Sequence, residues 1–508
     1  MVLWTRVTPS DDSAPGSGRG PRVEVRWEVA KDRRFRRVVR RGSVTTGLGR
    51  DHTVKVDVRG LSPATDYYYR FALRGVHSRV GRTRTAPARG ATPRNVRLGV
   101  VSCANWQAGY FAAYRGLAAR DDLHAVVHLG DYLYEYGPEE DMAASGLSGK
   151  PVLRPHDPPR EMVSLEDYRR RHAQYKTDPD LQDAHARHPW IVVWDDHEST
   201  NNSWRDGAGN HDPETEGDWH RRRARAHRAY DEWMPVRMAG TAEVGDGDRL
   251  FRRLRFGRLL ELSVLDLRSY RDEQVSPPAV NAAASDPART LTGKRQMRWL
   301  KRSLTRRAAQ WKVIGTPVMF APLGVKGLPD DVVRPLNQLL DLVPEDGFYA
   351  NADQWDGYTA DRNEVLATIR DEQVSDVVFI TGDIHSAWAA EIPYDASLYP
   401  VAGENAAVEF VATSVTSANL KDILGTPARH PLNLAVEQAI VAANPHMKHL
   451  NFDDHGFSVL DVTEERTQMD WFVIGDRTDR RTPITWSASF ATHTGTASVV
   501  RVDRPVDP

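Results

Sequence analysis

The sequence predicts a two-part α/β protein, with a small antiparallel β-sandwich at residues 1–88 and a layered α/β domain at residues 95–508. Two patterns predict this division. Before residue 90, apolar and charged residues alternate, which is typical of half-buried antiparallel strands. After residue 95, continuous apolar runs alternate with amphipathic stretches, which is typical of strands covered by helices. The length of 508 residues also exceeds what one ordinary hydrophobic core contains.

The predicted sandwich has its clearest strands at residues 22–29, 52–58 and 65–71. Leu61-Ser-Pro-Ala-Thr65 precedes the third of these strands and, together with Tyr67, resembles the corner of fibronectin-type sandwiches. Residues 85–93 contain two prolines and a glycine, and we interpret them as a linker.

The α/β part has strand-like runs at residues 98–103, 125–129, 190–194, 259–265, 311–315, 376–381 and 408–413. Helical stretches are predicted at 165–174, 219–234 and 293–309, and a further strand at 482–490. In such sheets ligands bind beyond the carboxyl ends of the strands. Polar residues that directly follow the apolar runs are therefore the candidates for a functional site.

Composition limits the function classes. The net charge is −1, with 68 basic and 69 acidic residues, so the chain lacks the basic surplus of a nucleic-acid-binding protein. No apolar run approaches the roughly 18 residues of a membrane span. The single cysteine excludes an internal disulfide.

Four apolar runs end in side chains that can bind metal ions. These ends are Cys103, Gly130-Asp131-Tyr132-Leu133-Tyr134, Asp195-Asp196-His197-Glu198 and Gly382-Asp383-Ile384-His385. Carboxylates, an imidazole, a thiol and a phenol at one edge of a sheet would form a dinuclear metal site. Such a site hydrolyses phosphate esters.

Each string also has a purely structural alternative. Cys103 alone could be a small buried apolar side chain, and Tyr134 a packed tyrosine in a turn. A phenol with a pKa near 10 binds metal only beside a strong Lewis acid, which favours ferric iron. Asp196 could cap a helix or bind a metal, and His197 could then act as a proton donor.

Two further residues, Arg268 and Asn202, are candidates for the site. Arg268, which follows a predicted strand, could clamp a phosphoryl oxygen or could pair with Asp266. The amide oxygen of Asn202 could complete the ligand shell of a hard cation such as calcium.

The order of the strings resembles the PhoD-like alkaline phosphatase and phosphodiesterase family of the metallophosphoesterases. The resemblance spans nearly the whole chain. Further matching strings are Val2-Leu-Trp-Thr-Arg6, Leu265-Asp-Leu-Arg-Ser-Tyr-Arg-Asp-Glu-Gln274, Trp311-Lys-Val-Ile-Gly-Thr-Pro-Val-Met-Phe320, Asp353-Gln-Trp-Asp-Gly-Tyr358, Thr381-Gly-Asp-Ile-His-Ser386 and His455-Gly-Phe457.

The resemblance implies a ligand set. Fe³⁺ would be held by Cys103, Asp131, Tyr134 and His385, and Ca²⁺ by Asp131, Asp196 and Asp383, with Asn202 as a further candidate. By the same resemblance, a hydroxide bridging the metals would hydrolyse phosphate mono- and diesters, and His197 would protonate the leaving group. Arg268 is kept as a candidate contact to the substrate.

The close alternative is the phospholipase D branch that shares these motifs, with a phospholipid as substrate. Rivals from other classes are a non-catalytic binding protein and a cysteine hydrolase. The family resemblance also implies a phosphate ester as partner, and secretion or a cell-envelope location by twin-arginine export. We further expect a monomer. No C-terminal helix matches the lid of some family members, which would leave the site open to bulky diesters.

Overall fold

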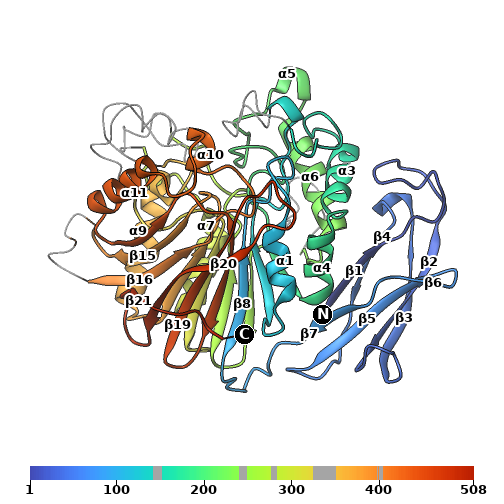
Figure 1. The fold of residues 1–508 in the computed structure, drawn as a ribbon, viewed down its shortest axis with the longest axis horizontal. Helices are drawn as coiled ribbons and strands as arrows, with labels where there is room; N and C mark the ends of the chain where they lie inside the picture. Colours follow the sequence, from blue (N-terminus) through green and yellow to red (C-terminus); the bar gives the residue numbers. More distant parts are fainter. Residues whose placement is uncertain are drawn as a thin grey trace.

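The computed structural model describes residues 1–140, 152–238, 249–275, 283–323, 351–396, 399 and 404–507. A small β-sandwich lies against one side of a larger body in which helices flank stacked sheets (Figure 1). The fold class predicted from the sequence is therefore confirmed.

The sandwich is formed by β1 to β7. One sheet has the order β3-β2-β5-β6, with β7 also paired to β5, and β1 pairs with β4 in the other. Leu3, Val25 and Val54 are buried in its core. The Tyr67 hydroxyl accepts a hydrogen bond from the Ser62 N–H at 2.9 Å, which is the corner expected from the sequence. The strands are β1 (Val2–Arg6), β2 (Val23–Ala30), β3 (Val38–Thr46), β4 (Thr53–Asp57), β5 (Asp66–Leu73), β6 (Val76–His77) and β7 (Gly81–Arg84), with a 3₁₀ turn at Leu48–Arg50.

The first sheet of the larger body has the order β10-β9-β8-β18-β19-β20-β21. Its β8, β9 and β10 are parallel, whereas β18 pairs antiparallel with β8 and continues as a meander to the C-terminal part of the chain. The predicted strand at 482–490 is confirmed as β20. The strands are β8 (Val96–Val101), β9 (Ala125–Leu129), β10 (Trp190–Val193), β18 (Gly456–Val462), β19 (Arg466–Ile474), β20 (Ile484–His493) and β21 (Val500–Val502).

The second sheet has the order β11-β12-β13-β14-β16-β15-β17, and its β12, β13, β14 and β16 are parallel. One hydrophobic core contains Val100 and Val459 of the first sheet together with Val313 and Phe410 of the second, so the sheets stack face to face. The strands are β11 (Arg252–Phe256), β12 (Leu260–Val264), β13 (Trp311–Thr316), β14 (Val377–Thr381), β15 (Ala387–Pro393), β16 (Asn405–Val411) and β17 (Met447–Asn451).

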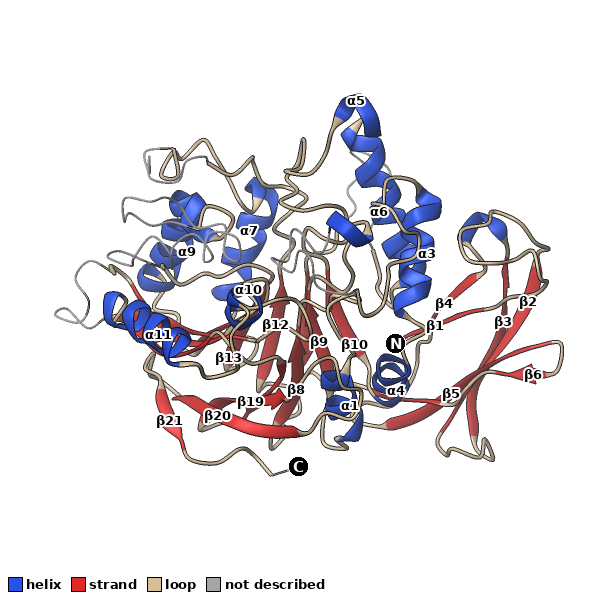
Figure 2. Cartoon of the chain, turned by 45° about the horizontal axis from the view of Figure 1, so that its top comes forward, coloured by secondary structure: helices blue, strands red, loops and turns tan. Residues whose placement is uncertain are grey.

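Helices cover the outer faces of this pair of sheets (Figure 2). Leu117 of α1, Tyr168 of α3 and Ala229 of α6 pack in the first core, whereas Leu300 of α7 and Ile369 of α9 pack in the core beneath the second sheet. The helices are α1 (Ala112–Ala119), α3 (Leu165–Tyr175), α4 (Pro179–Arg187), α5 (Pro213–Glu216), α6 (Trp219–Trp233), α7 (Gly293–Leu304), α9 (Thr359–Asp371), α10 (Leu420–Leu424) and α11 (Pro431–Ala443), with a 3₁₀ turn at Trp355–Tyr358.

Local sequence explains the ends of two predicted helices. Ser164 and Asp167 form a reciprocal capping box that starts α3 where the sequence predicts it. Helix α7 ends at Leu304, before the predicted end at residue 309, because the chain must turn to enter β13 at Trp311. In the part of the chain that is described, no helix is both long and apolar enough to cross a membrane.

The sandwich docks on α6. The indole N–H of Trp4 donates to the carbonyl of Glu232 at 2.8 Å, and the Lys55 ammonium pairs with the Asp231 carboxylate at 2.8 Å. The rings of Trp4 and Trp233 lie 5.8 Å apart. Within β1, Leu3 thus faces the core of the sandwich, whereas the neighbouring Trp4 contacts the larger body.

Candidate metal centre

The candidate ligands lie on loops that follow parallel strands of both sheets. Cys103 follows β8, Asp131 follows β9, Asp196 follows β10, and Asp383 and His385 follow β14. Because parallel strands end at one edge of a sheet and the sheets stack, these loops meet. The structure brings together the donor atoms of these residues in groups within 4.8 Å.

The backbone at these positions is strained. Five residues of the site have a positive φ, in the left-handed region that non-glycine residues rarely adopt. They are Cys103 (φ 60°), Asp131 (55°), Asn202 (52°), Asp383 (63°) and His385 (50°). Such conformations cost of order 1–3 kcal/mol each and cluster at functional sites. The fold therefore holds these side chains in positions that local preference alone would not give.

One group of donor atoms is mixed in character. The Sγ of Cys103, a carboxylate oxygen of Asp131 and a ring nitrogen of His385 all lie within 4.8 Å of one another. The Tyr134 hydroxyl lies 3.0 Å from Oδ2 of Asp131 and 3.3 Å from Nε2 of His385. Nδ1 of His385 contacts the carbonyl of Ala418 at 2.8 Å, which leaves Nε2 to face the cluster.

A second group consists of carboxylates. Oxygens of Asp131, Asp195, Asp196 and Asp383 lie within 4.8 Å of one another, so Asp131 belongs to both groups. Its Oδ1 is buried and accepts no hydrogen bond from any described residue. A buried carboxylate oxygen without a partner is costly, and a cation at this point would satisfy it.

Burial raises the pKa of the Asp131 and Asp383 carboxyl groups well above their ordinary values, and the neighbouring carboxylates Asp196 and Asp195 add to these shifts. Burial likewise raises the pKa of the Cys103 thiol and the Tyr134 phenol. The protein alone therefore favours neutral side chains here. A cation reverses that preference, because it binds the deprotonated forms.

His197 lies at the border of both groups. Its Nδ1 is 2.7 Å from Oε2 of Glu135, and its ring centroid is 4.1 Å from that of Tyr134. Burial lowers the pKa of His197, but Glu135 and Asp196 more than offset this effect and raise it well above the ordinary value. Since Glu135 occupies Nδ1, Nε2 remains available to a metal or a substrate.

Asn202 reaches Asp196 through its backbone. The Asn202 N–H donates to Oδ2 of Asp196 at 2.7 Å, and the His197 N–H donates to Oδ1 at 2.9 Å. These bonds orient the carboxylate of Asp196 toward the cluster. The role of the Asn202 amide as a ligand stays a prediction.

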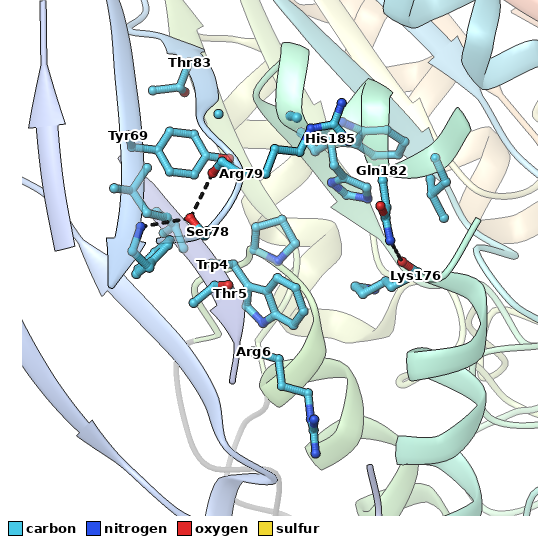
Figure 3. A pocket seen from close by; sticks show the side chains of 18 of the residues that line it. Trp4, Thr5, Arg6, Tyr69, Ser78, Arg79, Thr83, Lys176, Gln182 and His185 are labelled. Atoms are coloured by element: carbon cyan, nitrogen blue, oxygen red, sulfur yellow. Dashed lines mark hydrogen bonds between the residues drawn. The ribbon is translucent and has the colours of Figure 1, made fainter. Parts of the chain in front are cut away.

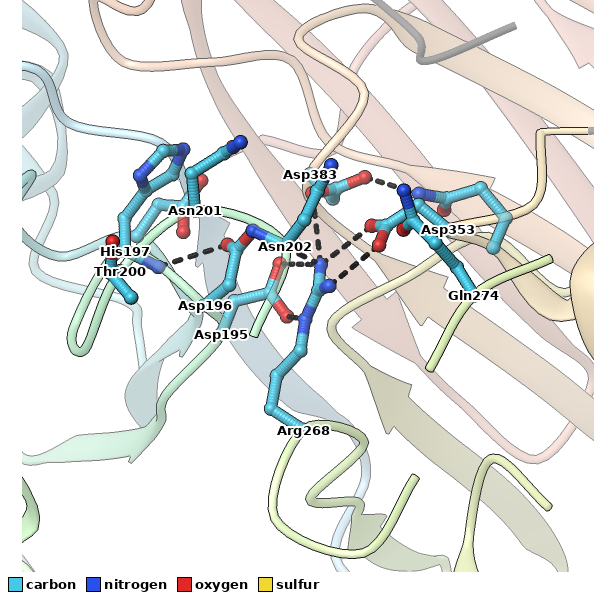
Figure 4. Close-up of polar contacts among 12 residues, drawn as sticks. Asp195, Asp196, His197, Thr200, Asn201, Asn202, Arg268, Gln274, Asp353 and Asp383 are labelled. Atoms are coloured by element: carbon cyan, nitrogen blue, oxygen red, sulfur yellow. Dashed lines mark hydrogen bonds and ion pairs between the residues drawn. The ribbon is translucent and has the colours of Figure 1, made fainter. Parts of the chain in front are cut away.

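Arg268 lies between carboxylates (Figure 4). Its guanidinium donates to both oxygens of Asp195 and, at 2.8 Å, to both oxygens of Asp353. It does not pair with the Asp266 side chain, which instead accepts the backbone N–H of Arg268 at 3.3 Å. The guanidinium is 3.7 Å from Asp196 and 3.6 Å from Asp383, and its role as a phosphoryl clamp stays a prediction.

Sequence reasoning missed residues that position the ligands. The Glu198 carboxylate accepts the N–H groups of Asp131, Tyr132 and Asp195, at 3.1, 2.6 and 2.8 Å, and so ties two loops together. Burial raises the pKa of Glu198 to about 8. Both Glu198 and Glu135 are acidic residues within or directly beside the strings that follow buried strands, and this placement could have identified them as positioning residues.

Two other positioning residues come from distant segments. Asp353 holds Arg268 from the far side, and the Ser417 hydroxyl donates to the Tyr134 hydroxyl at 2.7 Å. Asp353 lies in a string that the family resemblance had marked, without a role. No local pattern in the sequence identifies Ser417.

Comparisons with known proteins identify the family of the chain. The sequence profile described as "PhoD-like phosphatase" matches residues 98–471, and the profile of the N-terminal domain of PhoD-like phosphatases matches residues 1–87. Alkaline phosphatase D of Bacillus subtilis (strain 168) is 36% identical over 501 residues, which are 96% of this chain and 78% of that protein. The solved structure titled "Structure of PhoD" superimposes with a TM-score of 0.85 at 34% identity, over 99% of this chain and 90% of that one.

The profiles together span most of the chain, and the relative is similar over nearly all of it. The geometry supplies the dense set of metal-binding side chains that such enzymes need. The chain belongs to the PhoD-like phosphatase family and is a metal-dependent phosphoric ester hydrolase.

Proposed function

We propose that the protein hydrolyses phosphate mono- and diesters at a dinuclear centre in which Asp131 is shared by two unlike cations. The observation that carries this proposal is the position of Asp131, which belongs to both donor groups and has a buried oxygen without a protein partner. A carboxylate can bind one cation through each of its oxygens. The residues present therefore fit a bridged pair.

The donor chemistry differs on the two sides. Cys103, Tyr134 and His385 offer a thiolate, a phenolate and an imidazole, which suit iron, and we propose Fe³⁺ there. Asp196 and Asp383 offer oxygen donors only, which suit a hard cation, and we propose Ca²⁺, with the Asn202 amide as a further ligand.

The cations and the surrounding side chains have separate roles in the proposed reaction. When bound, the two cations supply Lewis-acid activation of water and stabilise charge on the phosphoryl group. His197 carries a proton at Nε2 toward the leaving oxygen, and Glu135 fixes its orientation and its tautomer. Arg268 holds Asp195 and Asp353 beside the carboxylate group, and a contact to substrate is proposed for it as well.

The decisive experiment is elemental analysis of protein purified without chelator, together with its visible spectrum. We expect iron and calcium, and a charge-transfer band from the tyrosine and cysteine ligands. Tyr134→Phe should shift or abolish the band and lower activity, whereas Tyr136→Phe, two residues away, should leave the band unchanged. A colourless, fully active protein that contains only zinc would refute the iron assignment.

Substrate class is tested separately. We expect turnover of a nitrophenyl monoester and a bis-nitrophenyl diester. Preferential hydrolysis of phosphatidylcholine would favour the phospholipase D alternative. Secretion or a cell-envelope location is a proposal that rests on the family alone, and a monomeric state is a further proposal.

A further inference from the structure

A cavity of about 500 Å³ lies between the sandwich and the helices α3, α4 and α6, and we call it the lateral cavity. Figure 3 shows side chains of β1 and the sandwich on one wall and those of the helices on the other. It contains none of the candidate metal ligands. Its volume falls within the range of about 300–1,000 Å³ that small-molecule sites occupy.

The walls of the lateral cavity are mainly apolar and aromatic. Its large lining side chains are Trp4, Tyr69, Phe71, Leu181, Trp190 and Trp233. His185 stacks on Trp190, with ring centroids 3.9 Å apart. Aromatic walls of this kind bury the flat or extended apolar part of a ligand.

The charged side chains that line the cavity are all cationic. The cavity is lined by Arg6, Arg79, Arg82 and Lys176, and no described aspartate or glutamate lines it. The three arginines pair with carboxylates that lie outside the lining, namely Asp51, Asp183 and Asp66. Because these arginines are already paired, the attraction of the lining for an anion rests on Lys176.

Lys176 differs from the arginines because no carboxylate among the described residues pairs with it. Its Nζ lies 3.2 Å from the Tyr132 hydroxyl and 3.4 Å from the Met234 sulfur, and it lies over the Tyr132 ring at 4.4 Å from the centroid. Burial lowers the pKa of Lys176 to about 7. An acidic ligand group would supply the missing counter-charge.

We propose that the lateral cavity binds an apolar molecule that carries one carboxylate, with the carboxylate at Lys176 and the apolar part against the aromatic wall. A charge-assisted hydrogen bond in an apolar setting is stronger than a neutral one. The Tyr132 hydroxyl, which Lys176 contacts, also lies 3.0 Å from Nε2 of His185, a lining residue, so Lys176 is connected to the aromatic wall. This site is separate from the metal centre.

The test is calorimetric titration of the metal-loaded, full-length protein with 2-naphthoate and with 2-naphthylmethanol, its neutral counterpart. We expect saturable binding of the carboxylate, at least tenfold tighter than binding of the alcohol. Inorganic phosphate, which should occupy the metal centre, is expected not to displace the naphthoate. Equal affinity for both compounds, no binding, or displacement by phosphate would overturn the proposal.

Variants locate the site. Lys176→Met keeps a long, unbranched side chain, shorter by one heavy atom, and removes its charge, so naphthoate should bind roughly tenfold or more weakly while the alcohol binds as before. Ala173→Trp, one helical turn away in the lining, should fill the cavity and abolish binding of both.

Two readouts serve as controls. Lys301→Met on α7, where Lys301 is paired with Glu364 at 2.8 Å, should bind both compounds like the wild type. Turnover of a nitrophenyl monoester should be unchanged in Lys176→Met. Wild-type binding of naphthoate by either Lys176→Met or Ala173→Trp would refute the assignment of the lateral cavity.

Discussion

Nδ1 of His197 lies 2.7 Å from Oε2 of Glu135, and both side chains are buried. The carboxylate raises the pKa of the imidazole and directs its other nitrogen toward the metal-binding side chains. In the metal-loaded enzyme, cations would cancel much of the influence of Asp131 and Asp196 on His197. Glu135 would then be the main group that keeps His197 protonated.

Glu135→Gln should therefore lower the pKa of His197 and move the alkaline limb of kcat/KM to lower pH, because a general acid acts only while it holds its proton. The measurement is a pH profile on an alkyl phosphate, whose poor leaving group needs that proton. Metal content should stay unchanged. An unshifted profile would exclude His197 as the acid.

His197→Ala tests the same residue more directly. If His197 donates a proton and is not a ligand, the variant should keep both metals. It should slow alkyl esters by ~10²–10⁴-fold and nitrophenyl esters far less. Loss of metal from the variant would make His197 a ligand instead.

Asp196→Asn should weaken the all-oxygen side of the centre more than the side with Cys103. Elemental analysis should show calcium lost and iron retained. Chelation should inactivate the wild type, and added calcium should restore it. Full activity after thorough removal of calcium, with no other divalent ion present, would contradict the calcium assignment.

Removal of metal should make stability depend on pH in a defined direction. Burial raises the pKa of Asp131 and Asp383, so above about pH 4 the metal-free native state binds more protons than the unfolded chain. The free energy of unfolding should then fall as pH rises. Denaturant titrations between pH 5 and 9 should show a steeper fall without metal than with it; parallel curves would contradict this account.

Arg268→Met should destabilise the protein, because it leaves Asp195 and Asp353 buried with less compensating charge. Breaking a buried pair in this way costs about 3–5 kcal/mol. Arg298→Met, at an exposed position on α7, is the control and should change stability little. A raised KM with unchanged stability would instead identify Arg268 as the phosphoryl clamp.

Trp4→Ala should lower stability by about 3 kcal/mol without loss of metal, because it removes the contact between the sandwich and α6. Trp486→Ala, whose side chain is 37% exposed, should have a much smaller effect. Thermal unfolding and elemental analysis give both readouts. A folded variant that lost turnover would show that the sandwich contributes to the active site, contrary to the predicted division into residues 1–88 and 95–508.

Local patterns were enough to predict the strands that end at the metal centre. Ala125–Leu129 forms β9 as predicted, because a short, mainly apolar run that contains two valines and is bounded by glycine and polar residues is typical of a buried strand. The order of Cys103, Asp131, Asp196 and Asp383 after such runs also identified which side chains converge.

Partners that depend on tertiary structure could not be predicted in the same way. Arg268 could have paired with Asp266, two residues away, yet it pairs with Asp195 and Asp353. Those contacts exist only because the stacked sheets bring distant loops together. The same reason explains Ser417, which reaches Tyr134 across 283 positions of sequence.

The position of β8 between β9 and β18 has a consequence for biosynthesis. Strand β18 begins at Gly456, so during translation at about 5–20 residues per second one edge of β8 stays unpaired for tens of seconds. An unpaired strand edge invites association with other chains. The nascent chain also keeps its only thiol, directly beyond β8, open to oxidants and stray metal ions until nearly the entire polypeptide has been made.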